Sequence, residues 1–266
     1  MACYRFGSAR EETFGVDLRD YDQLFSEKLD LLRDLSRTER ITWRGDFRSP
    51  LQNAEISPRP MQQELPIWIG VGGTPQSAVR AGELGLPMAL AVLGGPIPAI
   101  TRMVDLYREA GQRAGHSLSN LKVSVNSHAY IGEGARQARE FHRAFYQQYL
   151  REAMPRGKRP LELSPAEFQS MTGPGTALMI GSAQEMIDKI MQEYELLHHD
   201  RFLAQIDVGR LPFREVAKAI ERFGEKVAPV IRAETRSDTP KGTDEIEPPT
   251  SIGESLDEEE LSVTRA

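Results

Sequence analysis

Cysteine is almost absent from this chain of 266 residues, which contains a single one, Cys3. A lone cysteine cannot form an intramolecular disulfide, and its place at the start of the chain argues against a catalytic thiol. Long apolar runs are absent as well: no stretch approaches the ~18 consecutive apolar residues of a membrane span, and the first residues lack the apolar core of a secretory signal. The sequence therefore predicts a cytoplasmic protein that does not enter the membrane.

An excess of basic residues is also missing. The net charge is −6 at pH 7, but residues 234–266 hold ten acidic and three basic residues, so residues 1–233 carry a net charge of only +1. A nearly neutral body gives no electrostatic reason to expect nucleic acid as a partner. The terminal segment is rich in Pro, Ser, Thr and Glu and poor in large apolar residues. We therefore expect one folded domain over 1–233 and an acidic disordered tail over 234–266.

The patterns of two common kinds of site are missing too. The five histidines show no metal-ligand spacing. No Ser-His-Asp or cysteine-based nucleophile pattern appears either. The sequence therefore predicts neither a metal centre nor a hydrolase triad.

The most informative stretch runs from Pro66 to Gly95 and reads PIWIGVGGTPQSAVRAGELGLPMALAVLGG. A short β-branched run, typical of a buried strand, is followed by Gly72 and Gly73 and then by Thr74, a good helix N-cap. A second buried strand over 87–92 completes a unit of the size of one parallel crossover. Backbone N–H groups bared by two glycines at a helix N-terminus form an anion site, so the stretch predicts a phosphate-bearing ligand.

Strands and helices alternate along most of the chain, which is typical of a parallel α/β architecture. The strands that we expect cover 67–71, 87–92, 121–131, 177–180 and 202–208, and the main helices 17–32, 75–84, 98–115, 134–154, 183–197 and 212–232. A short capped helix is expected from Ser164, a small hairpin over 41–47 and an extended connector over 48–66. Half of a (βα)8 barrel and an open doubly wound sheet both satisfy this pattern.

The Pro66–Gly95 stretch, with ISPRP before it and FLAQIDVGRLP late in the chain, resembles the bacterial luciferase-like flavin-dependent monooxygenases. The similarity covers roughly residues 17–232. It implies a (βα)8 TIM barrel that binds reduced FMN or, in one branch, the deazaflavin F420. It also implies that the strands here are the fifth to the eighth and that the first strands of the barrel are missing. Residues 4–14 then resemble a degraded version of the Gly-Ser-rich segment that follows the fourth strand.

The resemblance implies that the glycine turn binds the phosphate of a flavin. Gly72 and Gly73 would bare the backbone N–H groups, Thr74 and Ser77 would add hydroxyl donors, and the helix dipole would favour the anion. Arg80 on the same helix could assist. The alternative is a tight turn in which the glycines are only steric and Thr74 is only a cap.

Two further groups of residues are implicated by the same resemblance. Gly94 and Gly95 end the second strand, where they either allow close approach of the backbone to the flavin or form a turn with positive φ. Asn126 and His128 stand at alternate positions of the 121–131 strand, so both leave one face, in a row with Ser124. The inward row of a barrel strand lines the active site, which makes Asn126 and His128 the predicted catalytic residues and His128 a hydrogen-bond donor or proton acceptor at the flavin. A histidine satisfied within the core is the alternative.

The implied function is a flavin-dependent monooxygenase that uses reduced FMN and O2 on a small organic substrate, with a flavin reductase and a homo-oligomer as further partners. An alternative function, from a different functional class, is that of a non-catalytic half-barrel that binds a phosphate-bearing ligand or pairs with another chain along its strand edge. A third is a barrel enzyme that acts on a phosphorylated metabolite without flavin. The choice between FMN and F420 stays open.

Overall fold

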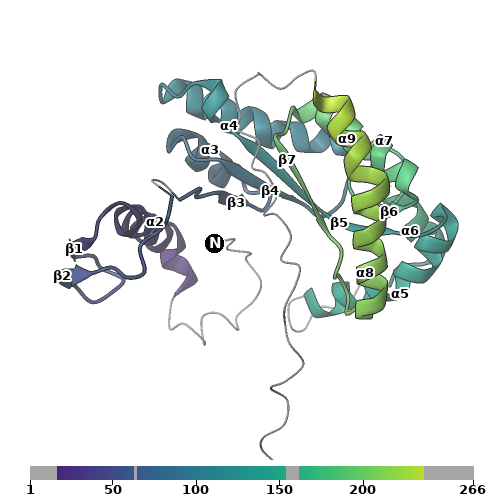
Figure 1. The fold of residues 1–266 in the computed structure, drawn as a ribbon, viewed down its shortest axis with the longest axis horizontal. Coiled ribbons are helices and arrows are strands. Elements are labelled where there is room, and N and C mark those ends of the chain that lie inside the picture. The colour runs from purple at the N-terminus through teal and green to yellow at the C-terminus, as the bar shows by residue number, and fades with distance from the viewer. Residues whose placement is uncertain (1–16, 63–64, 154–161, 237–266) are drawn as a thin grey trace, which may run out of the picture.

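The computed structural model describes residues 17–62, 65–153 and 162–236 (Figure 1). It comprises a small N-terminal lobe, with one long helix and a two-stranded antiparallel sheet, and a larger part in which helices pack along a parallel sheet. The predicted remnant over 4–14, the loop at 155–160 and nearly all of the predicted acidic tail lie outside the described residues. The last described helix ends at Thr235.

The N-terminal lobe consists of α2 (Tyr21–Arg37) and the antiparallel strands β1 (Arg40–Trp43) and β2 (Leu51–Glu55). A hairpin is present as predicted, but the position predicted for its second strand, 46–47, is wrong. These two residues instead donate their backbone N–H groups to the carboxylate of Glu27 on α2, at 2.6 to 3.1 Å. They therefore lie in a loop, and the second strand forms inside the segment that the prolines had marked as an extended connector.

Arg59 closes the C-terminal end of α2. Its guanidinium donates hydrogen bonds to the carbonyl oxygens of Leu35, Ser36 and Thr38 at 2.6 to 2.9 Å. Carbonyls of a last helical turn have no intrahelical partner, and a cation is favoured there by the helix dipole. The arginine of the ISPRP segment thus has a structural role as a helix cap.

Arg59→Ala is expected to lower the free energy of unfolding by about 1–3 kcal/mol, because it removes a charged donor shared by three carbonyl oxygens. Urea denaturation followed by circular dichroism measures the change. Arg44→Ala is the control, since Arg44 is an exposed arginine of the same lobe. An equal loss in both variants would contradict the capping role.

The larger part is built on five parallel strands: β3 (Ile69–Val71), β4 (Met88–Val92), β5 (Val123–Ile131), β6 (Met179–Gly181) and β7 (Arg201–Gln205). The sheet has β4 between β3 and β5. The first part of β5 pairs with both β4 and β7, and its last three residues pair with β6. Every pair is parallel, so the predicted α/β class is confirmed.

Helices follow the strands, as in βα units. In chain order they are α3 (Pro75–Glu83), α4 (Thr101–Arg113), α5 (Ala135–Ala153), α6 (Pro165–Met171), α7 (Ala183–Leu197), α8 (Phe213–Arg222) and α9 (Ala228–Thr235). Ser164 and Ser182 form capping boxes at the starts of α6 and α7, each with the glutamate three residues later. The single closing helix predicted over 212–232 is divided by a π-helical turn at Phe223–Val227.

A second apolar cluster lies around the end of β5 and includes Tyr146, Ile190 and Ala219. One face of the rest of the sheet carries the first apolar core and is covered by helices. Gly82 of α3 allows the α3–α4 contact, because a Cβ there would lie 2.2 Å from the carbonyl oxygen of Tyr107. The buried residues of this core include Ile69, Val71, Met88, Leu90, Val123 and Val125 from the strands and Ala78, Ala81, Val104, Tyr107 and Leu197 from the helices. No helix among the described residues combines the length and the apolar character that crossing a membrane requires.

Candidate functional site at the carboxyl ends of the strands

The turn after β3 lies exposed at the carboxyl end of the sheet. Gly73 has a φ of 97°, which only glycine adopts easily, and no atom of another described residue lies within 4 Å of the place that a Cβ would occupy on Gly72 or Gly73. Thr74 is the N-cap residue of α3, as predicted, but its side chain makes no capping hydrogen bond. The hydroxyl is therefore not committed to the cap, and the turn borders open space.

A second glycine turn follows β4 at the same end of the sheet. Gly94 and Gly95 have φ values of 153° and 85° and are exposed, and a Cβ on either would again meet no atom within 4 Å. The carbonyl oxygen of Gly95 accepts a hydrogen bond from the N–H of Ala177 at 2.9 Å, which fixes the far side of the turn. The turn thus requires positive φ, and it also leaves room for a ligand close to the backbone. It is therefore compatible both with a purely conformational role of the two glycines and with close approach of the backbone to a flavin.

The predicted row on β5 lies on the face of the sheet opposite the apolar core. Register places Ser124 beside Ala89 of β4, and Asn126 beside Ala91 of β4 and Leu203 of β7. Paired residues of neighbouring parallel strands point to the same face of the sheet. The small side chains of Ala89 and Ala91 on β4 therefore lie beside Ser124 and Asn126. Asn126 is half-buried.

His128 is buried rather than open to solvent, with 2% of its surface exposed. Its ring meets Tyr149 edge-on, with centroids 4.7 Å apart, and Tyr146 in the same manner at 5.9 Å. The hydroxyl of Tyr146 donates to the carbonyl oxygen of Leu93 at 3.3 Å, directly before the second glycine turn. The structure therefore brings two predicted groups, His128 and the turn at Gly94, to a shared aromatic neighbour.

Burial lowers the pKa of His128 to about 4, although the carboxylate of Asp207 acts in the opposite direction. The imidazole is therefore neutral at pH 7. A neutral ring can donate or accept a hydrogen bond, but with this pKa it is a weak base near neutral pH. A role for His128 at the flavin stays a prediction, and its lowered pKa suits a hydrogen-bonding role better than that of a proton acceptor.

Sequence reasoning missed the part that α5 plays at this site. The helix contacts segments that follow β4 and β7: Tyr146 reaches Leu93, and Glu152 forms an ion pair with Arg210 at 2.7 Å. It therefore lies across the carboxyl ends of the strands and buries His128. The aromatic spacing in FHRAFYQQY was the available signal, but it reads equally well as the core side of a helix.

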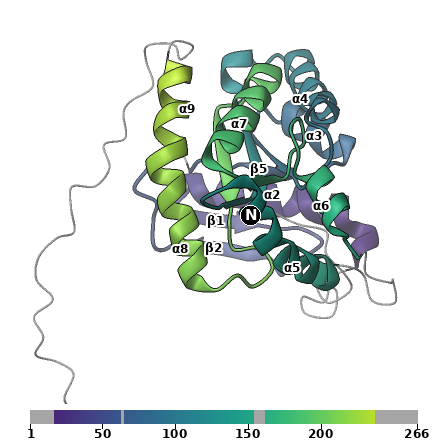
Figure 2. The same ribbon diagram turned by 90° about the vertical axis from the view of Figure 1, so that its right-hand side faces the viewer.

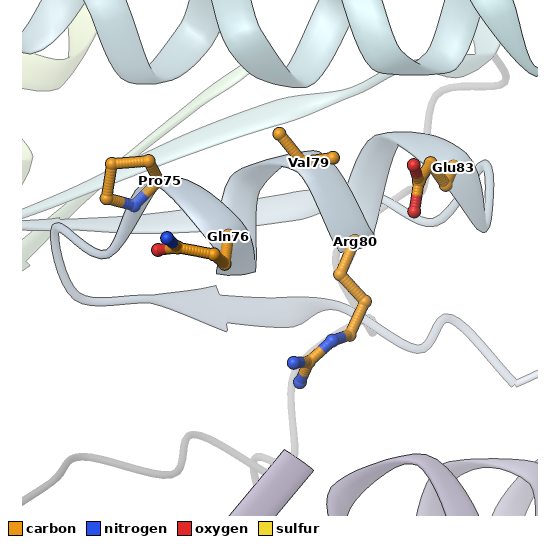
Figure 3. Close-up of a pocket in the computed structure, with 5 residues that line it drawn as sticks. All are labelled: Pro75, Gln76, Val79, Arg80 and Glu83. Atoms are coloured by element: carbon orange, nitrogen blue, oxygen red, sulfur yellow. The ribbon is translucent and has the colours of Figure 1, made fainter. Parts of the chain in front are cut away.

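Arg80 does not serve the glycine turn. Its guanidinium lies 2.5 Å from the carboxylate of Asp22 and 4.9 Å above the ring of Phe25, both on α2. A shallow hollow of about 390 Å³ runs along this part of α3, and all of its lining residues belong to that helix: Pro75, Gln76, Val79, Arg80 and Glu83 (Figure 3). We assign no ligand to it.

The residues at the carboxyl end fit a phosphate-bearing cofactor by the chemistry of their donors. Two glycine turns border open space, Gln76 in the first turn of α3 offers a backbone N–H while Pro75 before it has none, and Thr74 has a hydroxyl outside the cap. Ser77, half-buried on the same helix, donates its backbone N–H to the carbonyl oxygen of Thr74 at 3.0 Å, which leaves its side chain as the only further donor it can offer. Within the described ranges, no three His, Cys, Asp or Glu side chains gather as metal ligands do.

Comparison with known proteins adds a family. Residues 6–200 match the family model described as luciferase-like monooxygenase. A curated protein of Sinorhizobium fredii (strain NBRC 101917 / NGR234), described as uncharacterized protein y4vJ, is 24% identical over 233 residues. That match covers 83% of this chain and 65% of the relative, so the chain spans about two thirds of the relative's length.

Solved structures share the fold. Monooxygenase RslO1 from Streptomyces bottropensis superposes with a TM-score of 0.69 at 21% identity, over 84% of this chain and 67% of its own. The oxygenating constituent of 3,6-diketocamphane monooxygenase from Pseudomonas putida, in complex with FMN, gives 0.56 at 17%, over 79% and 63%. An F420-dependent secondary alcohol dehydrogenase, in complex with an F420–acetone adduct, gives 0.56 at 19%, over 77% and 60%.

Proposed function

The chain belongs to the luciferase-like monooxygenase family, and from this premise we propose that it is a flavin-dependent oxidoreductase that binds FMN or F420 at the carboxyl ends of its strands. The observation that carries the proposal is the pair of open glycine turns beside the buried His128. Proteins of the same fold that were solved with FMN and with F420 support both cofactors equally.

The first glycine turn would hold the phosphate. The N–H groups of Gly73 and Gln76, with the hydroxyls of Thr74 and Ser77, would be the donors to an anion at this helix N-terminus. The backbone at Gly94 and Gly95 would lie against the cofactor without a side chain between them. When bound, the reduced flavin supplies the electrons for the reaction with O2.

The side chains on β5 would orient what binds there. Asn126 and His128 share the face opposite the core, and the neutral imidazole of His128 would hold a hydrogen bond without changing its charge near neutral pH. The rings of Tyr146 and Tyr149 seal His128 from water on one side. A small organic substrate and O2 are the reactants that we propose.

A non-catalytic ligand-binding role is the second candidate. It is favoured by β7, which presents Arg201, Leu203 and Gln205 as exposed side chains on the face that carries the site. An active pocket normally shields its reacting groups from water.

Binding and turnover separate the two candidates. The protein is titrated with FMN, F420 and riboflavin while flavin fluorescence is followed. We expect quenching by FMN or F420 at roughly tens of micromolar or below. The yield of oxygenated product against H2O2 is then measured with chemically reduced FMN, which removes the need for a flavin reductase, and with small aldehydes or ketones as substrates. Binding of FMN without any oxygenated product would favour the second candidate, and no binding of either cofactor would overturn the first.

A further inference from the structure

The outer side of α8 carries an apolar stripe that the described fold leaves exposed. Phe213 is 84% exposed and Ile220 55% exposed, and Ala217 between them is also exposed. Spacings of four and three residues place the three on one side of the helix. Val216, Ala219 and Phe223, which pack against the core, form the neighbouring side.

This stripe differs from the scattered apolar residues of an ordinary surface. Single exposed apolar side chains are normal, but a continuous exposed face is typical of an interaction site. In Figure 2, α8 and α9 stand as one rod at the edge of the molecule, with α7 on their inner side. Gly224 continues the stripe by one turn, and within the described part of the chain no atom lies within 4 Å of the place that its Cβ would occupy.

The charges along one flank of the stripe indicate which kind of partner binds to it. Arg214 and Glu221 lie seven residues apart, hence on the same flank, and both are exposed. Neither forms an ion pair with any residue that the structure describes. One flank therefore carries a positive charge toward the start of α8 and a negative charge toward its end.

We propose that α8 is the contact surface between two copies of this chain, paired antiparallel about a two-fold axis. A two-fold axis that reverses the helix brings equal flanks together, so Arg214 of each copy lies beside Glu221 of the other. With the axis between Lys218 and Ala219, Phe213 faces Gly224 of the second copy, and Ala217 faces Ile220. The large ring then meets the position without a side chain.

A second copy suits this face better than an unrelated partner does, because the face is complementary to itself in charge and in shape. A contact centred on one helix from each copy is small, and small interfaces are weak and reversible. The proposal does not depend on the cofactor or on the activity proposed above.

Sedimentation equilibrium tests the proposal. Wild type, Arg214→Glu and Glu221→Arg are measured separately over roughly 1–200 µM, which brackets the affinity of such interfaces. We expect wild type to dimerise, and each single variant to dimerise at least about tenfold more weakly, because both ion pairs become like-charge contacts. An equimolar mixture of the two variants should dimerise like wild type, since the introduced glutamate of one chain then faces the introduced arginine of the other.

Controls make the result specific to α8. Both substitutions lie at exposed positions, so thermal unfolding followed by circular dichroism should be close to wild type for each. Phe213→Ser should weaken the dimer as well. A monomeric wild type at the highest concentration would overturn the proposal. So would a dimer that neither charge variant weakens, or a mixture that associates no better than the variants alone.

Discussion

Gly209→Ala is expected to lower the free energy of unfolding by more than about 3 kcal/mol. Gly209 follows β7 and has a φ of 77°. A Cβ there would lie 1.9 Å from the carbonyl oxygen of Phe145 on α5 and 2.4 Å from its carbonyl carbon. Both obstacles are backbone atoms of a helix, so no side-chain rotation relieves the clash.

The same contact positions the candidate site. Gly209 and the Arg210–Glu152 ion pair hold α5 against the end of β7, and α5 carries the two tyrosines that bury His128. We therefore expect any folded fraction of the variant to expose His128 more than wild type does. Urea denaturation measures the stability, and hydrogen exchange of α5 measures the displacement.

Gly134→Ala is the matched control. Gly134 lies at the start of α5, and no atom is found within 4 Å of the place that its Cβ would occupy. Its replacement should change the free energy of unfolding by less than about 1 kcal/mol. A loss of that small size at Gly209 would show that α5 does not rest on this glycine.

Acid is expected to unfold the protein between about pH 6 and pH 4, because three histidines are buried in a neutral state. Burial lowers the pKa of His128 and His199 to about 4 and that of His142 to about 3. As the pH falls below the ordinary histidine pKa of 6.5, these histidines become protonated in the unfolded chain but stay neutral in the folded chain. The free energy of unfolding therefore decreases until the pH reaches the pKa of the folded state. Glu193, whose pKa burial raises to about 8, opposes part of this slope.

His142→Phe should make that slope shallower. No hydrogen-bond partner for either ring nitrogen of His142 exists among the described residues, and the ring stacks on Tyr130 at 5.1 Å. A phenyl ring keeps the stacking and cannot be protonated, so the variant should exceed wild type in stability by about 2 kcal/mol at pH 5.

Urea denaturation at pH 7, 6 and 5 gives the slope. His116→Phe is the control, because His116 is the histidine at the turn after α4 and is not buried. The same slope in wild type and in His142→Phe would refute the assignment of the acid sensitivity to this buried ring.

Local signals in the sequence were sufficient for the parallel order of the elements. The glycine turn before Thr74, the Ser164 cap and the alternation on β5 all depend on neighbours along the chain, and each is present in the structure. The alternation also predicted that Asn126 and His128 share a face.

Contacts between distant parts of the chain could not be predicted in this way. The loop over 46–47 depends on a carboxylate of α2, and the burial of His128 depends on where α5 rests at the end of β7. Sequence periodicity could assign α5 as a helix but not the end of the sheet that it crosses. For the same reason Arg80, on the correct helix, faces Asp22 instead of the turn.

The central claim is that the turn after β3 holds the phosphate of a flavin, and it is tested by comparing FMN with riboflavin, which lacks the phosphate. Thr74→Ala/Ser77→Ala removes two proposed hydroxyl donors and keeps the glycines. We expect the dissociation constant for FMN to rise about tenfold or more, and that for riboflavin to change less than about twofold, because each lost hydrogen bond to a charged group costs about 1.5–3 kcal/mol. Equal weakening of both ligands, or no weakening of FMN, would contradict the account.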